Sequence, residues 1–173
     1  MTKIMFGNIE LTTPKTQNKR MSLVLWGPSG AGKTTLAGTA PRPILWINFD
    51  PDGTSSLQNQ PDIFIADFAT SPPNTIVKFK HDNVAGLKQL LDEHPEIKTV
   101  VFDSVTTFNE LSLKHGVTEV TGATMEAPTL AGYGRRNSYT MQAIMALVKL
   151  TSAMDKHLIL IAHEDAPQKD ELS

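Results

Sequence analysis

The sequence contains no cysteine. This absence excludes disulfide bonds, thiolate metal sites and cysteine nucleophiles, and it fits a reducing cytosol. No apolar run approaches the length of a membrane span, and residues 1–11 lack the long apolar core of a signal peptide. The formal net charge is only −2, so any contact with nucleic acid has to come from a local basic patch. We therefore expect a cytoplasmic protein.

The 173 residues suffice for one domain with its own core. Continuous apolar runs alternate with helical patterns, which predicts an α/β fold, a parallel sheet covered by helices on both faces. We expect this domain over residues 21–173, after an N-terminal extension over residues 1–20. The sequence ends soon after a predicted strand, which leaves open a minimal domain or a piece of a longer protein. We favour the piece.

Local patterns predict the individual elements. Expected strands cover residues 22–26, 43–49, 99–102 and 158–162, all buried, with an edge strand over 63–68 and a short strand within 4–11. Expected helices cover residues 33–40, 84–94, 104–115 and 137–154. In the last helix, Met141, Ile144, Met145 and Val148 form an apolar stripe that we assign to the core. Residues 69–80 and 117–134 are expected to be loops, the second because it holds three glycines without periodicity.

The most informative motif is Gly27–Thr34, directly behind the apolar run 23–26. It matches the phosphate-loop pattern G-x-x-x-x-G-K-[ST] at every fixed position, between a strand and a helix as that pattern requires. Glycines permit a tight turn whose backbone N–H groups surround phosphate oxygens. Lys33 should reach the β- and γ-phosphates, and the Thr34 hydroxyl should ligate Mg²⁺. The alternative is a glycine-rich turn with a chance lysine. The expected nucleotide-binding residues are Gly27, Pro28, Ser29, Gly30, Ala31, Gly32, Lys33, Thr34 and Thr35.

A second candidate lies where the buried strand 99–102 ends. Asp103 follows that strand directly, and parallel α/β sheets bind ligands at the carboxyl ends of their strands. We predict that Asp103 holds Mg²⁺ together with Thr34. The alternative role for Asp103 is a helix N-cap, because acidic residues favour helix starts.

Hydrolysis also requires a group that orients or deprotonates the attacking water. Ser104, the neighbour of Asp103, cannot act as that base. Asp50, at the end of the strand over 43–49, is the natural candidate, and Asp52 is the second choice. The segment Asp-Pro-Asp-Gly is also a good turn without any catalytic role.

The last predicted strand ends at Ile161-Ala162-His163-Glu164. His163 is a candidate sensor of the γ-phosphate, as in nucleotide switches, and Glu164 is an alternative water-orienting acid. A histidine that simply leaves the sheet for solvent is equally compatible with the pattern. His157, at the start of the strand, is expected to be structural. The five histidines show no metal-ligand spacing along the chain, so no zinc site is expected.

Two adjacent arginines, Arg135 and Arg136, follow Tyr133 at the end of the predicted loop 117–134. This combination suits contact with a nucleic-acid backbone together with base stacking. An arginine that reaches into the nucleotide site of a neighbouring subunit is a second interpretation, and a solvated helix start is the third. Basic residues at a helix N-terminus oppose the helix dipole, which favours an external anionic partner.

Three motifs together, Gly27–Thr34, Val100–Ser104 and Ile159–Glu164, resemble the RecA-like ATPase core. The chain is most similar to small phage-encoded RecA-like ATPases of single-strand annealing and recombination. The resemblance implies a three-layer P-loop fold in which the phosphate-loop strand lies beside the His163 strand, then the Asp103 strand, then the Asp50 strand. It also implies ATP and Mg²⁺ as cofactors, single-stranded DNA as a partner, and a ring or filament of subunits. Asp50 departs from the pattern, because relatives usually carry glutamate there.

Three functions follow from these observations. The leading one is an ATPase that couples nucleotide state to binding of single-stranded DNA, with Lys33, Asp50 and His163 as catalytic residues. The second is a P-loop kinase of a small molecule, against which the scarcity of arginine counts. The third is a nucleotide-gated assembly module without hydrolysis, for which the short side chain of Asp50 leaves room.

Overall fold

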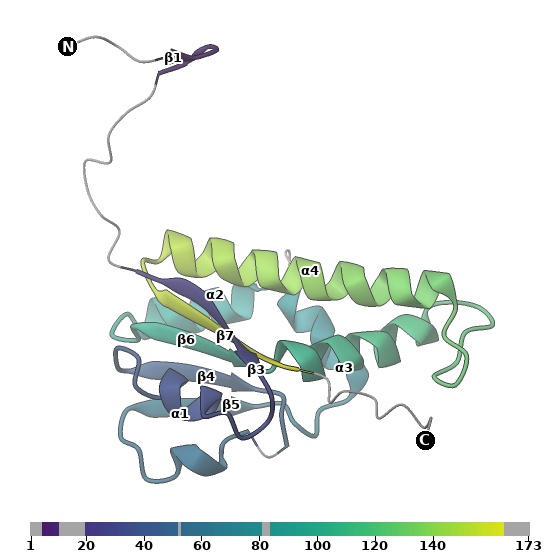
Figure 1. The fold of residues 1–173 in the computed structure, drawn as a ribbon, viewed down its shortest axis with the longest axis horizontal. Helices are drawn as coiled ribbons and strands as arrows, with labels where there is room; N and C mark the ends of the chain where they lie inside the picture. The colour runs from purple at the N-terminus through teal and green to yellow at the C-terminus, as the bar shows by residue number, and fades with distance from the viewer. Residues whose placement is uncertain (1–4, 11–19, 52, 81–83, 165–173) are drawn as a thin grey trace, which may run out of the picture.

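The computed structural model describes residues 5–10, 20–51, 53–80 and 84–164. Its centre is a sheet of five parallel strands in the order β3-β7-β6-β4-β5 (Figure 1). These strands are β3 (Ser22–Gly27), β4 (Ile44–Asn48), β5 (Ile63–Asp67), β6 (Thr99–Asp103) and β7 (His157–His163). The α/β prediction and the strand order implied by the resemblance are both confirmed.

Helices cover the two faces of the sheet unequally. One face carries α1 (Lys33–Ala37) and a 3₁₀ turn, η1 (Ser55–Leu57). The other carries η2 (Pro73–Phe79), α2 (Ala85–Glu93), α3 (Val105–Thr118) and α4 (Leu130–Ala153). The predicted three-layer arrangement is therefore present, and the larger hydrophobic core lies under α2, α3 and α4.

A separate two-stranded antiparallel sheet precedes the domain. Its strands are β1 (Met5–Phe6) and β2 (Ile9–Glu10), and Figure 1 shows them away from the central sheet. The strand predicted within residues 4–11 is thus a short hairpin. Among the described residues, no helix is both long enough and apolar enough to pass through a bilayer.

The strand before the phosphate loop is not buried as predicted. β3 forms one edge of the described sheet and pairs only with β7 there. As a result Val24 is 60% exposed and Trp26 is 66% exposed. An apolar run alone does not distinguish a central strand from an edge strand, so the prediction that residues 22–26 are buried was wrong. The segment that we predicted as an edge strand, β5, does form the opposite edge.

The long loop predicted over residues 117–134 is largely helical. α3 continues through Gly116 to Thr118, and α4 already begins at Leu130, where the Thr129 hydroxyl accepts a hydrogen bond from the backbone N–H of Gly132. The helix predicted over residues 104–115 stopped short of Gly116, but this glycine lies inside α3, where the two helices touch. A Cβ atom at Gly116 would approach the Cβ of Arg135 to 3.0 Å and the carbonyl oxygen of Gly132 to 3.2 Å. The glycines therefore permit close helix packing instead of ending a helix.

Two smaller predictions about packing are also wrong. Residues 69–80 contain the 3₁₀ helix η2, which buries Ile76 and Phe79 against the core. On α4, Met141 and Met145 are 61% and 47% exposed, although we assigned them to the core. The neighbouring stripe of α4 faces inward, and its buried members are Tyr139, Ala143, Ala146, Leu147 and Leu150.

Candidate functional site

The predicted phosphate loop connects the end of β3 to the start of α1. Gly30 and Gly32 have φ angles of 77° and 81°, a left-handed conformation that glycine adopts at little cost. The loop borders a cavity of about 410 Å³, within the size range of small-ligand sites. The residues that line it are Ser29, Gly30, Gly32, Lys33, Thr34, Thr35, Asp50, Gly53, Ser55, Ser56 and His163. Six of the nine residues predicted to bind nucleotide therefore face this cavity, together with Asp50 and His163 from other strands.

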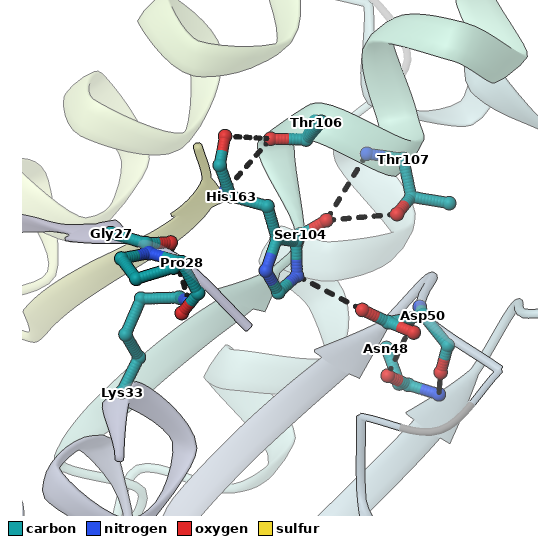
Figure 2. A network of polar contacts seen from close by, with 9 residues as sticks. All are labelled: Gly27, Pro28, Lys33, Asn48, Asp50, Ser104, Thr106, Thr107 and His163. Atoms are coloured by element: carbon teal, nitrogen blue, oxygen red, sulfur yellow. Dashed lines mark hydrogen bonds and ion pairs between the residues drawn. The ribbon is translucent and has the colours of Figure 1, made fainter. Parts of the chain in front are cut away.

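The Lys33 side chain folds back onto the backbone of the phosphate loop. Its ammonium group donates hydrogen bonds to the carbonyl oxygens of Gly27, at 2.8 Å, and Pro28, at 2.7 Å (Figure 2). Lys33 is only 9% exposed, so these two carbonyls replace the water that a buried ammonium loses. The lysine lies at the wall of the cavity, held by the backbone of its own loop.

The register of the sheet brings the polar strand ends to one edge. Asp103 at the end of β6 lies opposite Asn48 of β4, and Gly27 of β3 lies opposite His163 of β7. Because parallel strands end at the same side of a sheet, the phosphate loop, Asp103 and His163 meet there, as the sequence predicted. Asp50 follows β4 by two residues and reaches the same edge.

Asp50 and His163 contact each other directly. The Asp50 carboxylate oxygen Oδ2 lies 2.9 Å from His163 Nε2 (Figure 2). Each of Asp50, Asp103 and His163 offers a ligand atom within 4.8 Å of those of the other two. These three residues are separated from each other by more than fifty positions along the sequence, yet they form one cluster beside the phosphate loop.

Asp103 is the most deeply buried member of this cluster. It is 1% exposed, and neither of its carboxylate oxygens accepts a hydrogen bond of good geometry. Burial, and then the negative charge of Asp50, raise the pKa of Asp103 to about 7, while the Trp46 indole and the Lys33 ammonium partly oppose this rise. A carboxylate in these surroundings is stabilised by a proton or by a cation.

The alternative role of Asp103 as a helix cap is wrong. The N-cap of α3 is Ser104, whose hydroxyl oxygen accepts a hydrogen bond from the backbone N–H of Thr107 at 3.1 Å. The Asp103–Ser104 peptide bond is cis. Because Ser104 caps the helix, the Asp103 carboxylate is left to face the site.

Two residues that the sequence analysis missed, Thr106 and Asn48, form hydrogen bonds with the backbone groups of His163 and Asp50. The Thr106 hydroxyl accepts a hydrogen bond from the His163 backbone N–H at 2.8 Å and donates one to the His163 carbonyl at 3.3 Å. The Asn48 amide donates to the Asp50 carbonyl at 2.9 Å and accepts from the Asp50 N–H at 3.3 Å. One signal was available, since Asn48 is a polar residue at the end of an otherwise apolar strand. Nothing in the sequence singled out Thr106.

The three residues predicted to contact DNA or a neighbouring subunit lie on the first turns of α4, not on a loop. α3 and the first half of α4 run side by side past the carboxyl ends of the strands (Figure 1). The Arg136 guanidinium lies over the Tyr133 ring, 5.0 Å from its centroid, and its Nε donates to Asn137 Oδ1 at 3.1 Å. Tyr133 is 38% exposed, so this stacked pair is accessible from solvent.

Arg135 has different surroundings from Arg136. Its Nε lies 4.0 Å from Glu119 Oε2, and the same carboxylate oxygen accepts a hydrogen bond from the Tyr139 hydroxyl. The hydrogen bond from Tyr139 lowers the pKa of Glu119, and burial with the Glu119 contact raises the pKa of Tyr139 to about 12. Arg135 therefore takes part in a polar contact between α3 and α4 although it is exposed, whereas Arg136 is half-buried and stacks on Tyr133.

The remaining candidates lie as follows. Glu164 is exposed, and its backbone N–H donates to the Gly27 carbonyl at 3.1 Å, but its side chain does not line the cavity. Asp52, the second choice for the water-orienting acid, lies outside the described residues. His157 begins β7 at the opposite end of the sheet from His163, and its Nδ1 accepts a hydrogen bond from the Met21 N–H at 3.1 Å.

Comparison with known proteins gives one finding at the level of family. A search of curated proteins yields no match to the sequence. The profile of a family described as "AAA domain" matches residues 19–172, which is most of the chain and includes the phosphate loop and every strand of the central sheet. The chain belongs to this AAA domain family of P-loop ATPase type.

Proposed function

We propose that this protein hydrolyses ATP and couples its nucleotide state to the binding of single-stranded DNA, as in phage-type recombination or annealing. The observation that carries the proposal is the meeting of the phosphate-loop cavity with the Asp50–His163 pair at one edge of the sheet. A cavity bordered by a lysine, hydroxyl groups, a carboxylate and an imidazole suits a polyphosphate and a reacting water.

The phosphate loop would bind the triphosphate. Backbone N–H groups of the loop and the Lys33 ammonium would contact phosphate oxygens, which requires Lys33 to exchange its bonds to the Gly27 and Pro28 carbonyls. Because the new partners carry negative charge, this exchange favours the bound state.

The residues present fit a Mg²⁺ ion. Asp103 is a buried carboxylate whose oxygens lack good hydrogen-bond donors, and oxygen ligands of this kind are what Mg²⁺ prefers. Thr34 and Asp103 would hold it. Bound there, the ion would neutralise phosphate charge that develops during transfer.

Asp50 and His163 would act on the reacting phosphate. Asp50 would orient the water that attacks the γ-phosphorus and accept its proton while the bond to the ADP oxygen breaks. His163 both lines the cavity and contacts Asp50, so a γ-phosphate that attracts the imidazole would release the Asp50 carboxylate for this task. Loss of the γ-phosphate would restore the pair.

The first turns of α4 would contact the DNA. Tyr133 offers a ring for base stacking, and Arg136 offers charge for the phosphate backbone. Arg135, which lies near Glu119, would contact DNA or a neighbouring subunit of a ring or filament.

Phosphate release from ATP tests the proposal. The wild type should hydrolyse ATP faster with single-stranded DNA than without it. Lys33→Ala should lose nucleotide binding, and Asp50→Ala should bind but lose turnover by roughly 100-fold or more. Lys88→Ala, which changes an exposed lysine on α2, is the matched control and should behave as wild type. Normal hydrolysis by Asp50→Ala would refute the role given to Asp50.

One observation favours a second candidate, a nucleotide-gated assembly module that does not hydrolyse. Asp50 is engaged by His163, and its side chain is one carbon shorter than the glutamate usual in the RecA-like pattern. Tight ATP binding without phosphate release by the wild type would support this candidate over the ATPase.

A further inference from the structure

The cluster of Asp50, Asp103 and His163 contains an imidazole, a ligand that magnesium itself would not select. Two carboxylates and an imidazole offer ligand atoms within 4.8 Å of one another, although the residues come from three different strand ends. Metal–ligand distances in such sites are about 2.0–2.2 Å, so small adjustments of the three side chains would bring all of them onto one ion.

The buried carboxylate is the independent sign that this cluster takes a ligand. Asp103 is 1% exposed, and both of its oxygens lack a hydrogen-bond partner of good geometry. Buried polar groups are nearly always partnered, so an orphaned carboxylate beside a second carboxylate indicates a cation.

The imidazole decides the kind of cation. Magnesium prefers oxygen ligands only, whereas imidazole nitrogen suits zinc and neighbouring transition metals. A set of two carboxylates and one histidine with a side open to a cavity resembles three-ligand zinc sites that keep one position free.

We propose that Asp50, Asp103 and His163 form a binding site for a divalent transition-metal ion, zinc in the first place, in the nucleotide-free protein. The ion would replace the direct Asp50–His163 contact by bonds from both side chains to the metal. The site shares Asp103 with the magnesium site proposed above, so the two ions would compete. Spacing along the sequence did not suggest a zinc site, because the ligands meet only through strand order.

Cobalt provides the probe, because Co²⁺ substitutes for zinc and absorbs visible light in low-coordinate sites. The sequence has no cysteine, so no thiolate band can obscure the spectrum. Nucleotide-free wild type should bind one Co²⁺ with visible bands, and Zn²⁺ should displace it. His163→Gln and Asp50→Asn should each weaken the binding of Co²⁺ by at least about tenfold, the least that loss of even a supporting partner usually costs.

Two matched variants serve as controls. His157→Gln changes the histidine at the other end of the same strand and should leave Co²⁺ binding intact. Thr34→Ala removes a proposed magnesium ligand outside the cluster and should bind Co²⁺ as wild type does, even if it no longer binds magnesium–ATP. Failure of ATP hydrolysis therefore leaves this inference standing, and failure of Co²⁺ binding leaves the proposed ATPase standing.

A measurement on the wild type removes any dependence on whether the variants fold. In a long-range ¹H–¹⁵N spectrum of the histidine rings, Zn²⁺ should shift the Nε2 signal of His163 selectively. No visible Co²⁺ bands, bands unchanged by His163→Gln, or a zinc effect on another histidine instead of His163 would each overturn the proposal.

Discussion

Two buried charges lie at the same edge of the sheet, and their surroundings differ. Lys33, 9% exposed, donates to two carbonyl oxygens of its own loop. Asp103, 1% exposed, has no well-formed hydrogen bond and faces a second carboxylate, Asp50. The phosphate loop therefore satisfies its charge by itself, whereas the acidic strand ends depend on a proton or a cation. Removing the two charges should change stability in opposite directions.

The largest effect should come from Asp103→Asn, and it should depend on pH. The pKa of Asp103 is about 7 in the folded protein, against 3.8 for the free side chain. Well below pH 3.8 the carboxyl is protonated in both the folded and the unfolded state, so it does not change the free energy of unfolding. As pH rises through 7 the folded protein loses the stability that this proton provided, by at most about 4 kcal/mol.

The comparison of wild type with Asp103→Asn should therefore show two regimes. At pH 8 without divalent ions, the variant should be more stable than wild type by about 2–4 kcal/mol in urea unfolding. Near pH 4 the difference should fall to almost zero. Asp92→Asn, at an exposed position on α2, is the control. A pH-independent difference would mean that Asp103 is not the titrating group.

Lys33→Met should have a smaller effect of opposite sign. Without the ammonium, the Gly27 and Pro28 carbonyls lose their donor, which should lower the free energy of unfolding by about 1–2 kcal/mol. Urea unfolding at pH 8 measures it, with Lys88→Met as control. If Lys33→Met stabilised the protein, the buried Lys33 ammonium would destabilise the fold as the Asp103 carboxylate is expected to do. The difference between the two buried charges would then be refuted.

The smallest effect should come from Thr106→Val, which removes the hydroxyl that binds both backbone groups of His163. We expect a loss of about 1 kcal/mol and faster amide exchange at His163, because that N–H loses its acceptor. Thr106→Ser keeps the hydroxyl and should retain protection. Equal exchange in the valine and serine variants would show that Thr106 does not position His163.

The parts of the site that the sequence predicted are those encoded locally. The glycines and Lys33 follow one another along the loop, and Asp103 directly follows a continuous apolar run, so pattern and chemistry coincide. The strand order came from the resemblance and was confirmed. Asp50 and His163 were proposed because each follows a predicted strand, but their mutual contact depends on the order of the strands.

The predictions that were wrong concern packing between distant segments. Gly116 ends a helix by its local propensity, yet here it provides the clearance for Arg135 and Gly132 of α4. Helix packing outweighs the cost of glycine in a helix. Similarly, the apolar run before the phosphate loop gave no sign of its edge position, and Met141 and Met145 face outward because a neighbouring stripe of α4 packs inward.

The two tryptophans of the chain differ strongly in how much of each side chain is exposed. Trp26, 66% exposed, comes one residue before the loop, while Trp46 is fully buried and its indole acts on the Asp103 carboxyl. Their fluorescence should differ accordingly. Trp26 should emit at longer wavelength and be quenched by iodide, whereas Trp46 should emit at shorter wavelength and be protected from iodide. A Trp26→Phe protein would retain a single tryptophan, and its emission, excited selectively at the red edge of the tryptophan band, would report without any added label when the neighbouring carboxyl gains or loses charge.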